Sequence, residues 1–341
     1  MGIKKILLGY LLLLLANETT TAQTAVFQFL DLSPSARITA LGGQQVAIMD
    51  NDPTGAAQNP ALYNEQMHHQ LAVNHQFYVA DIQQGAVGFA HRWKTSPLTF
   101  GGGVQYVTYG NFVRTDLYAN TIGEFSAGEY AVHLGGSWQR RHWRYGMNVR
   151  WIGSQLADYN ANGLSADFGA AYRDSSGRFM AAIVLKHAGA MLNTYAGERE
   201  KLPTDLQIGV SHRLKYLPFR FSVMAHDLFR WDIRYPRQEP SNTIVLGQDE
   251  AKKKSYFVDN LFQHLIFSGE LYLGKVLTLR VAYNHQRKQV FWMNNRRSLA
   301  GFSFGAGIQI KRFGIDYGRA IWHPAGGNHH LCPHEMTWPA I

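Results

Sequence analysis

The sequence predicts an all-β fold, a transmembrane antiparallel up-and-down β-barrel of 14 strands with an N-terminal plug segment. Three observations predict it: a leader for export, long segments that alternate apolar and polar residues, and connections that alternate between short and long. Leu277, Leu279 and Val281 fall on one face of such a segment. Thr278 and Arg280 fall on the other face. A strand between lipid and a polar lumen needs this two-residue period.

The first residues have the composition of a signal peptide. Lys4 and Lys5 precede an apolar run from Ile6 to Ala16, and small residues follow it. That run is shorter than the roughly 20 apolar residues of a spanning helix, so we expect it to direct export and to be removed. The chain then divides into a signal peptide (1–22), an N-terminal plug segment (23–66) and an outer-membrane β-barrel (67–341).

The composition excludes several classes of protein. Charged residues make up 17% of the chain, and a mainly helical enzyme would carry more Glu, Lys and Ala. The net charge of +9 would suit nucleic acid, but an exported barrel meets anionic lipid head groups first, so we expect no nucleic-acid partner. The single cysteine, Cys332, excludes an intrachain disulfide framework and a cysteine-cluster metal site. We expect no cofactor.

The plug segment is rich in small residues and turn formers, with a short helix expected near residues 53–58. This composition favours a compact segment packed inside the barrel mouth over a loose periplasmic tail. Its motif residues are Arg37, Gly42, Gly43, Asp50, Asn59, Pro60 and Ala61.

Thirteen strands are expected after this segment. They cover residues 68–78, 82–93, 98–109, 127–140, 142–155, 162–174, 178–188, 204–214, 218–228, 262–273, 276–286, 298–311 and 313–322. A soluble sandwich also alternates, but its strands usually have about five or six residues. The lengths therefore favour a membrane barrel.

The connections set the orientation. Tight turns alternate with longer links at 110–126, 156–161, 189–203, 229–261 and 287–297. Outer-membrane barrels have short periplasmic turns and long extracellular loops, so the first strand should run outward from a periplasmic N-terminus.

The end of the chain conflicts with this plan. A bacterial barrel closes with an even number of strands, so one more strand should follow residues 324–327. Residues 328–339 contain two prolines and no alternation, and proline cannot donate to the closing ladder. We expect the last strand to be anomalous from about residue 328. Our hypothesis is a frameshifted or otherwise aberrant tail, which resequencing the 3′ end of the gene tests.

The segment ahead of the barrel resembles that of the PorV/PorQ group of fatty-acid-transporter-like (FadL-type) barrels. The residues that carry the resemblance are Phe27–Leu30, Ser33–Arg37, Leu41–Gly43, Ala47, Asp50, Asn59–Ala61 and, near the end, Asp316–Ala320. The likeness covers about residues 25–327.

This resemblance implies a non-enzymatic outer-membrane component of the type IX protein secretion system. It further implies an attachment complex with PorU and PorV that holds the surface protein PorZ. The cargo of that complex is joined to anionic lipopolysaccharide, so lipopolysaccharide and outer-membrane lipid are expected partners as well.

The lumen positions carry charges of both signs, which survive burial when they are paired. They are Arg144, Arg150, Lys186, Arg220 and Arg280 against Asp167, Asp205, Glu270 and Asp316. We expect ion pairs that brace the barrel and the plug. A carrier of hydrophobic ligands would instead need an apolar cavity.

No catalytic or metal-binding pattern stands out. The Ser, His and carboxylate residues form no recognisable catalytic constellation in the sequence, so we expect no enzyme, although a hydrolase remains a third and weaker hypothesis. The tail residues His329, His330, Cys332, His334 and Glu335 resemble zinc ligands only superficially, and no metal site is expected. Lumen histidines at 133, 226 and 264 are interpreted as polar groups in contact with water. Gly101–Gly103 are interpreted as positions without side chains that let another part of the chain pack closely against the strand.

The outer loops offer binding chemistry, because exposed aromatic and arginine residues are typical interface anchors. The candidate partner-binding residues are Trp231, Arg234, Tyr235, Tyr256, Phe257, Phe291 and Trp292. Contact with lipopolysaccharide at the membrane rim is the alternative. The first functional hypothesis is thus an anchor for a surface complex in type IX secretion. The alternative is a FadL-type transporter of hydrophobic small molecules.

Overall fold

The structure is a computed structural model. It describes residues 25–78, 82–93, 96–195, 197, 200–233, 257–290, 299–311, 313–323 and 326–334, and for residues 322–334 the backbone alone. The expected signal peptide lies outside these ranges. Within them, no helix has the length and hydropathy to cross a membrane.

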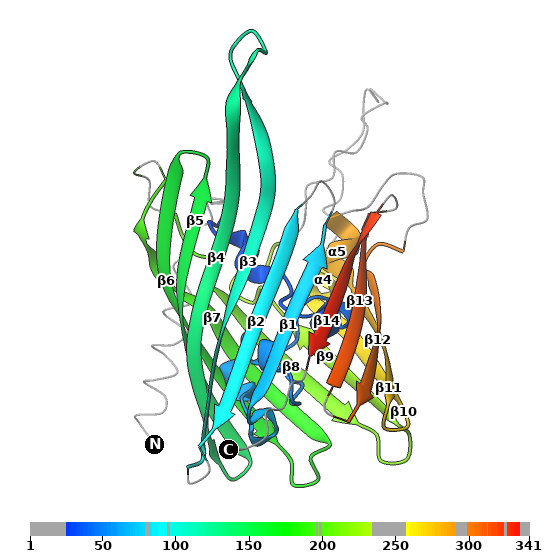
Figure 1. Cartoon of the computed structure of the whole chain (residues 1–341). Coiled ribbons are helices and arrows are strands. Elements are labelled where there is room, and N and C mark those ends of the chain that lie inside the picture. Colours follow the sequence, from blue (N-terminus) through cyan, green and yellow to red (C-terminus); the bar gives the residue numbers. More distant parts are fainter. Residues whose placement is uncertain are drawn as a thin grey trace, which may run out of the picture.

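Fourteen antiparallel strands of the described chain form a closed barrel (Figure 1). They are β1 (Gln70–Phe77), β2 (Gln83–Arg92), β3 (Leu98–Thr115), β4 (Thr121–Arg140), β5 (Trp143–Leu156), β6 (Tyr159–Arg173), β7 (Phe179–Asn193), β8 (Asp205–Arg213), β9 (Phe219–Ala225), β10 (Leu265–Leu273), β11 (Leu277–Asn284), β12 (Phe302–Ile310), β13 (Phe313–His323) and β14 (Gly326–His334). Each strand pairs with its neighbours along the chain, and β1 also pairs with β14. The predicted fold class is confirmed.

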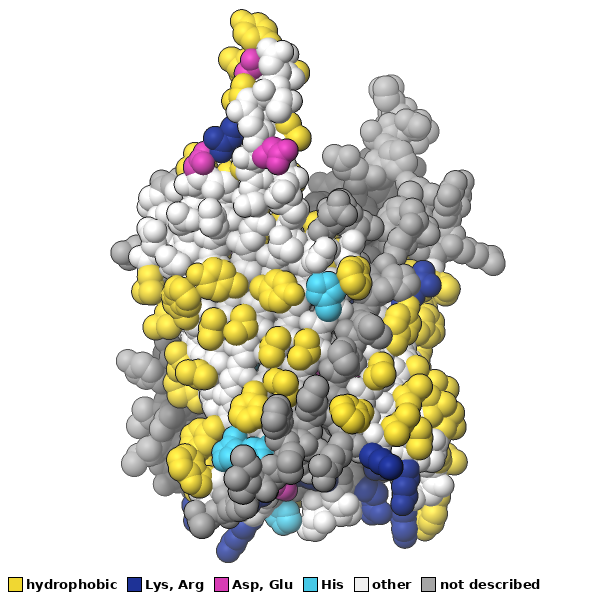
Figure 2. All heavy atoms as spheres, in the orientation of Figure 1, with side chains coloured by type: hydrophobic (Ala, Val, Ile, Leu, Met, Phe, Trp, Pro, Cys, Tyr) yellow, Lys and Arg dark blue, Asp and Glu magenta, His cyan; other side chains and the backbone are white. Residues whose placement is uncertain are grey.

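The two-residue period separates a lipid face from a lumen face. In β5, Tyr145, Met147 and Val149 are between 43 and 46% exposed, whereas the alternate residues Asn148 and Arg150 are at most 2% exposed. The outward side chains form a hydrophobic band around the barrel wall (Figure 2). A closed barrel with such a band is the fold of proteins of the bacterial outer membrane, which is where this protein resides.

Aromatic side chains gather on the lipid face near the tight turns. Trp93 lies 6.2 Å from Phe100, and Trp138 and Trp143 both lie next to Tyr145, at 6.2 and 6.4 Å between ring centroids. Tryptophan and tyrosine favour the membrane–water interface because their rings have an apolar body and a polar edge. This girdle therefore marks the height at which the periplasmic head groups meet the barrel.

β14 closes the barrel by pairing with strands on both sides. It follows β13 along its length and meets β1 from Phe77, opposite His329, to Ala72, opposite His334. The ladder with β1 is interrupted opposite Cys332 and Pro333. Proline lacks an N–H, which accounts for the interruption.

The expectation of an anomalous last strand from about residue 328 is therefore wrong for residues 328–334. Backbone hydrogen bonds do not depend on alternating side chains, and a single proline one residue from the strand end removes few of them. The hypothesis of an aberrant tail loses its structural basis there. Glu335 lies outside the described residues, as do the side chains of His329, His330, Cys332 and His334.

The link expected at residues 110–126 is mostly strand. β3 continues to Thr115 and β4 begins at Thr121, so the two form a hairpin that projects well beyond the rest of the barrel (Figure 1). Phe112 stacks on Phe125 at 5.3 Å across this hairpin, and Arg114 lies over the Phe125 ring at 5.7 Å. Cross-strand aromatic pairs of this kind stabilise a two-stranded ribbon that the sequence pattern missed.

The N-terminal segment, residues 25–67, lies inside the barrel (Figure 1). Its short helices are η1 (Gln28–Asp31), α2 (Ala36–Ala40), α3 (Pro53–Ala56), η2 (Pro60–Leu62) and η3 (Glu65–Met67). Side chains of β1, β2, β3, β5, β8, β9 and β10 hydrogen-bond to it. The segment is therefore hydrogen-bonded to strands on several sides of the barrel.

Two helices occupy the extracellular side where long loops were expected. α4 (Phe257–Gln263) covers the end of the link at residues 229–261 and the first two residues of the strand expected after it, and α5 (His285–Val290) covers the last two residues of an expected strand and the start of the link at residues 287–297. His285 of α5 meets the carboxylate of Asp259 of α4 at 3.2 Å, and Gln289 donates to the same carboxylate at 3.3 Å. The helices thus support each other at the barrel rim.

We predict that Gly146→Ala weakens the seating of the N-terminal segment. A Cβ at Gly146 would lie 2.3 Å from the carbonyl carbon of Pro60, so the segment or β5 must shift. The expected loss is about 1–3 kcal/mol in the free energy of unfolding, measured by urea titration in detergent. Gly128→Ala is the matched control, because its Cβ meets only Val107 O at 3.3 Å. Equal losses in both variants would contradict this packing.

Candidate functional site

Arg37 is the central motif residue of the N-terminal segment, and α2 holds it in place. Ser35 caps this helix, its Oγ accepting from Ile38 N at 3.2 Å. Gly43 ends it, its N–H donating to Ile38 O at 2.9 Å. The Arg37 guanidinium then reaches β10, where Nη2 donates to Glu270 Oε1 at 2.9 Å. A charge on the plug is thereby joined to a charge on the wall.

Glu270 gathers further arginines from neighbouring strands. Arg220 Nε lies 3.4 Å from it and Arg280 Nε lies 3.2 Å from it. Arg280 also pairs with Asp316, and Arg37 pairs with Asp50 of its own segment. Three guanidiniums therefore meet three carboxylates, and the group is electrically neutral. Neutrality and multiple hydrogen bonds are what make buried charges tolerable.

The electrostatics of the lumen keep Arg37 charged. Burial opposes its charge, but attraction by Glu270, Tyr272 and Asp316 outweighs burial and raises the pKa of the guanidinium above its usual value. The cation is therefore permanent. Arg37 acts as a fixed electrostatic link between the segment and the wall.

A second ion pair lies across β5 and β6. Arg150 Nη2 donates to Asp167 Oδ2 at 2.9 Å and to Ala57 O at 3.0 Å. Asp167 Oδ1 accepts from His187 N at 2.8 Å. Both charged side chains are almost fully buried, with exposures of 2 and 0%. The network thus joins the wall to the loop after α3.

The expected bracing of the lumen by ion pairs is observed for most of the charges. Arg144 pairs with Glu65 of the N-terminal segment at 3.0 Å, a partner that the sequence pattern missed because it lies outside the strands. Lys186 and Asp205 lie opposite each other in the β7–β8 ladder. Asp205 accepts a hydrogen bond from Gln207 Nε2 at 2.7 Å instead.

Gly42 and Gly43 allow the chain to turn after α2. Their φ angles are +101° and +97°, a region that side chains disfavour. A Cβ at Gly42 would lie 2.4 Å from Ile266 Cγ2, and a Cβ at Gly43 would lie 2.5 Å from Arg287 Nη2. Gly42 O in turn accepts from Arg287 Nη2 at 3.0 Å. These glycines bring the backbone within reach of α5.

Asn59, Pro60 and Ala61 seat the segment against β5 and β6. Asn59 Oδ1 accepts from Ala61 N at 3.0 Å, which caps η2, and Asn59 Nδ2 donates to Val46 O at 2.8 Å. Proline suits the first position of such a turn because it needs no donor there. Gly169 of β6 leaves room for the motif, since a Cβ there would lie 2.1 Å from Asn59 Oδ1.

The lumen wall contains a glycine that makes room for the N-terminal segment and three histidines that are buried. Gly101 provides the expected relief, because a Cβ there would lie 2.1 Å from Tyr63 Cε1 of the N-terminal segment. His133, His226 and His264 are not wetted, since each is at most 4% exposed. His226 also lies at the edge of a cavity on the extracellular side of the segment.

A cavity of about 460 Å³ remains on the extracellular side of the segment. Most residues around it carry polar side chains, including Gln28, Asp31, Gln44, Gln76 and Arg287. Sites for hydrophobic ligands are lined mainly by apolar and aromatic groups. Leu32, Val290 and Ala320 also line the cavity, so its surface combines polar and apolar parts.

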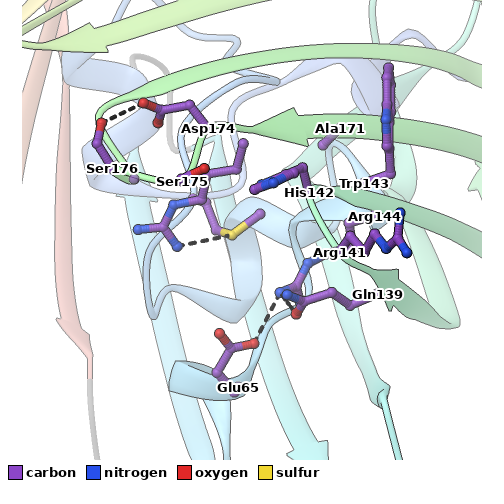
Figure 3. A pocket seen from close by; sticks show the side chains of 13 residues that line it. Glu65, Gln139, Arg141, His142, Trp143, Arg144, Ala171, Asp174, Ser175 and Ser176 are labelled. Atoms are coloured by element: carbon purple, nitrogen blue, oxygen red, sulfur yellow. Dashed lines mark hydrogen bonds and ion pairs between the residues drawn. The ribbon is translucent and has the colours of Figure 1, made fainter.

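A second cavity, of about 490 Å³, opens at the end with the tight turns (Figure 3). Glu65, Gln139, Arg144 and Asp174 are among the residues that point around it in the close-up. Its groups are already engaged with each other: Arg144 meets both Glu65 and Gln139, and Asp174 accepts from Ser176. The pocket is a polar recess at the periplasmic rim.

On the extracellular side, the structure brings together two of the expected partner-binding residues. The rings of Trp231 and Phe257 lie 5.3 Å apart, and both side chains are more than half exposed. Arg234, Tyr235, Tyr256, Phe291 and Trp292 lie outside the described residues. Trp231 and Phe257 therefore form the described part of this candidate surface.

His264 and Asn260 hold Trp231 in place, a role that was not expected from the sequence. His264 stacks on its indole at 5.5 Å, and His264 Nε2 lies 3.1 Å from Trp231 O. Asn260 Nδ2 donates to the same carbonyl oxygen. Both residues belong to or follow α4, whose short amphipathic pattern is hidden within a long link. Trp231 is consequently held in a fixed position at the rim.

Comparison with known proteins gives a fold but no family. No family model matches the sequence, and no curated protein matches it. The toluene transporter TbuX of Ralstonia pickettii is similar in structure, with a TM-score of 0.53 and 13% identity over 92% of this chain and 100% of that chain. The toluene transporter TodX of P. putida has a TM-score of 0.52 and 10% identity over 91 and 100%.

A FadL homologue of Pseudomonas aeruginosa has a TM-score of 0.49 and 12% identity over 89% of this chain and 98% of that chain. The first two comparisons show that this chain shares its barrel fold with these two toluene transporters. Sequence identity this low extends no further than the fold.

We predict that Arg150→Ala destabilises the barrel by about 3–5 kcal/mol, because it leaves the Asp167 carboxylate buried without its partner. Urea unfolding in detergent measures the loss. The matched control is Arg114→Ala, whose partner Asp158 at 2.7 Å is 76% exposed. That surface pair should contribute about 1 kcal/mol or less. A small effect of Arg150→Ala would refute the bracing role.

Proposed function

We propose that this protein is a non-enzymatic anchor in the outer membrane, which holds a cell-surface protein complex at its extracellular side. The observation that carries the proposal is the occupied lumen. The N-terminal segment is joined to the wall by a buried ion pair at Glu270, by a partly exposed ion pair at Glu65 and by hydrogen bonds from strands around the barrel. Breaking such buried pairs is costly, so the segment is suited to rigidity rather than to passage.

The extracellular side supplies surfaces for a partner. Trp231 and Phe257 are exposed aromatic groups on a helix-supported rim, which is the usual composition of an interface hot spot. The β3–β4 hairpin presents Leu117 and Tyr118 at its tip, both at least 86% exposed. Large apolar groups this far from the lipid favour contact with another protein.

The resemblance of the N-terminal motifs to the PorV/PorQ group supports a more specific role. We propose that the anchored complex is the attachment complex of type IX secretion, with PorZ held at the surface and PorU and PorV as associated proteins. Arg37, Asp50 and Asn59, which carry that resemblance, are also residues that fix the segment inside the barrel. Lipopolysaccharide would surround the extracellular rim.

Transport of a hydrophobic small molecule is the second candidate. TbuX and TodX, which share the fold, are toluene transporters, and this comparison favours transport over surface anchoring. The ion pairs that join the N-terminal segment to the barrel wall favour anchoring. The two candidates therefore differ in a measurable property, the passage of hydrocarbon.

We predict that the double variant Trp231→Ala, Phe257→Ala loses its surface partner. Removing two central aromatic anchors should reduce recovery of the co-purifying surface protein about tenfold or more, because such truncations each cost about 2 kcal/mol at hot spots. Quantitative mass spectrometry after purification from detergent-solubilised membranes measures recovery. Trp143→Ala is the control, since that residue is similarly exposed but belongs to the opposite, periplasmic girdle. Unchanged recovery in the double variant contradicts docking at this rim.

We also predict that vesicles containing the purified barrel take up radiolabelled toluene no faster than protein-free vesicles. The N-terminal segment is hydrogen-bonded to the wall and occupies the lumen, so it stands in the way of a ligand crossing the barrel. Purified TodX in the same vesicles is the positive control, as a protein described as a toluene transporter. Saturable uptake by this protein would reject the anchor proposal in favour of transport.

A further inference from the structure

Three histidines lie together where the N-terminal segment enters the barrel wall. His68 and His69 connect η3 to β1, and His91 lies near the periplasmic end of β2. The β1–β2 ladder pairs Gln70 with Ala90, so the next position along it sets His69 against His91. The fold therefore brings these three residues, here called the histidine cluster, to one place.

The imidazole rings of the cluster are close to one another. Ring centroids are 4.0 Å apart for His68 and His69, 4.9 Å for His68 and His91, and 4.8 Å for His69 and His91. One ligand atom from each ring lies within 4.8 Å of the other two. All three side chains are half-buried, so an ion can reach them from water.

An unusual backbone conformation creates this arrangement. Successive residues of a strand point to opposite faces, so His68 and His69 would ordinarily diverge. His69 has a φ of +58°, in the left-handed region that non-glycine residues seldom occupy. The resulting turn stacks the two rings on the same side. Strain of this kind persists where the surrounding structure maintains it, and it is frequent at functional sites.

We propose that His68, His69 and His91 bind a divalent transition-metal ion, with Zn²⁺ as the natural choice. Three neutral imidazoles and a water molecule give the four-coordinate geometry that zinc adopts at open sites. Zinc–nitrogen bonds of about 2.0–2.1 Å place nitrogen atoms roughly 3.4 Å apart, so ligand atoms now up to 4.8 Å apart approach one another by up to about 1.4 Å on binding. Rotation of three half-buried side chains is sufficient for this movement.

The hydrogen bonds of the rings are compatible with coordination. His69 Nδ1 is buried and has no hydrogen-bond partner among the described residues, so its lone pair is available to an ion. His68 Nδ1 accepts from Arg92 N at 3.3 Å, a long contact that a metal bond would replace. Imidazole is a good ligand for zinc, copper and nickel alike, and zinc is selected by the tetrahedral arrangement.

The charged groups beside the cluster are two guanidiniums and one carboxylate, and the carboxylate offsets part of the positive charge. Arg92 is the neighbouring positive side chain, and its Nη1 lies 3.5 Å from Glu65 Oε2. Glu65 also pairs with Arg144, at 3.0 Å, so it serves both guanidiniums. Because the imidazoles are neutral ligands, the bound ion would keep its positive charge near this carboxylate.

An ion at the cluster would join three parts of the chain. His68 and His69 end the N-terminal segment and start the barrel wall, and His91 belongs to the next strand. Coordination would tie the segment to the β1–β2 hairpin in addition to the ion pairs deeper in the lumen. A ligand that binds the folded state alone stabilises it in proportion to the logarithm of its concentration above the dissociation constant.

The test is metal binding by the full barrel, purified without a histidine tag and freed of metal with EDTA. Titration with Co²⁺ should produce the visible absorption bands of tetrahedral cobalt, and Zn²⁺ should abolish them. The thermal midpoint should rise with Zn²⁺. Calorimetric titration then counts the zinc ions bound per chain.

His91→Ala and His69→Ala should each lose one equivalent of zinc and the zinc-dependent rise of the thermal midpoint. His142→Ala is the matched control, an exposed histidine in the turn between β4 and β5 at the same end of the barrel. It should bind as the unaltered protein does. His91→Cys should restore binding and add a thiolate-to-cobalt charge-transfer band, which a purely structural role for His91 would not produce.

Histidines and the cysteine of the tail could take up an additional ion, so the deciding quantity is the difference between His91→Ala and the unaltered protein. Loss of one equivalent with the barrel still folded, judged by its resistance to SDS before heating, supports the site. Equal stoichiometry in both proteins overturns it. Absence of the cobalt bands in the unaltered protein and in His91→Cys overturns it as well.

Discussion

The structure depends on one constraint: a backbone within lipid must satisfy its polar groups internally. A closed ladder meets this constraint, and it does so through β14, whose side chains have no favourable pattern. Pro333 breaks the contact with β1 locally, yet the pairs between Phe77 and His329 and between Ala72 and His334 hold the seam on both sides. Closure is a property of the backbone, so a tail with an irregular sequence can still complete the barrel.

Closure creates a lumen, and the lumen must be filled or wetted. This protein fills it with its own N-terminal segment, which approaches the wall where glycines such as Gly146 and Gly169 remove side chains. The polar contacts are then matched in charge, with Arg37 and its neighbours balanced around Glu270. Packing and electrostatics act together here, because the segment and the neighbouring strands both bring charged partners within hydrogen-bond distance.

The two ends of the barrel differ in the chemistry that they present. The periplasmic end has tight turns, an aromatic girdle and a polar recess around Glu65 and Arg144. The extracellular end has the long β3–β4 hairpin and the two helices that hold Trp231. A fold shared with hydrocarbon transporters is therefore combined with a polar, occupied interior and with exposed aromatic groups outside. This combination is the basis for favouring a surface-anchoring role.

The sequence alone determined thirteen of the strands, their lipid and lumen faces and the fold class, because contact with lipid imposes a two-residue period that a single strand displays. It also identified most lumen charges that form ion pairs. Only the tertiary structure decided which charges meet, that β14 closes the barrel and that His68, His69 and His91 converge. Partners such as Glu65 for Arg144 are distant in sequence and follow no period, so their contacts arise from packing the segment within the closed wall.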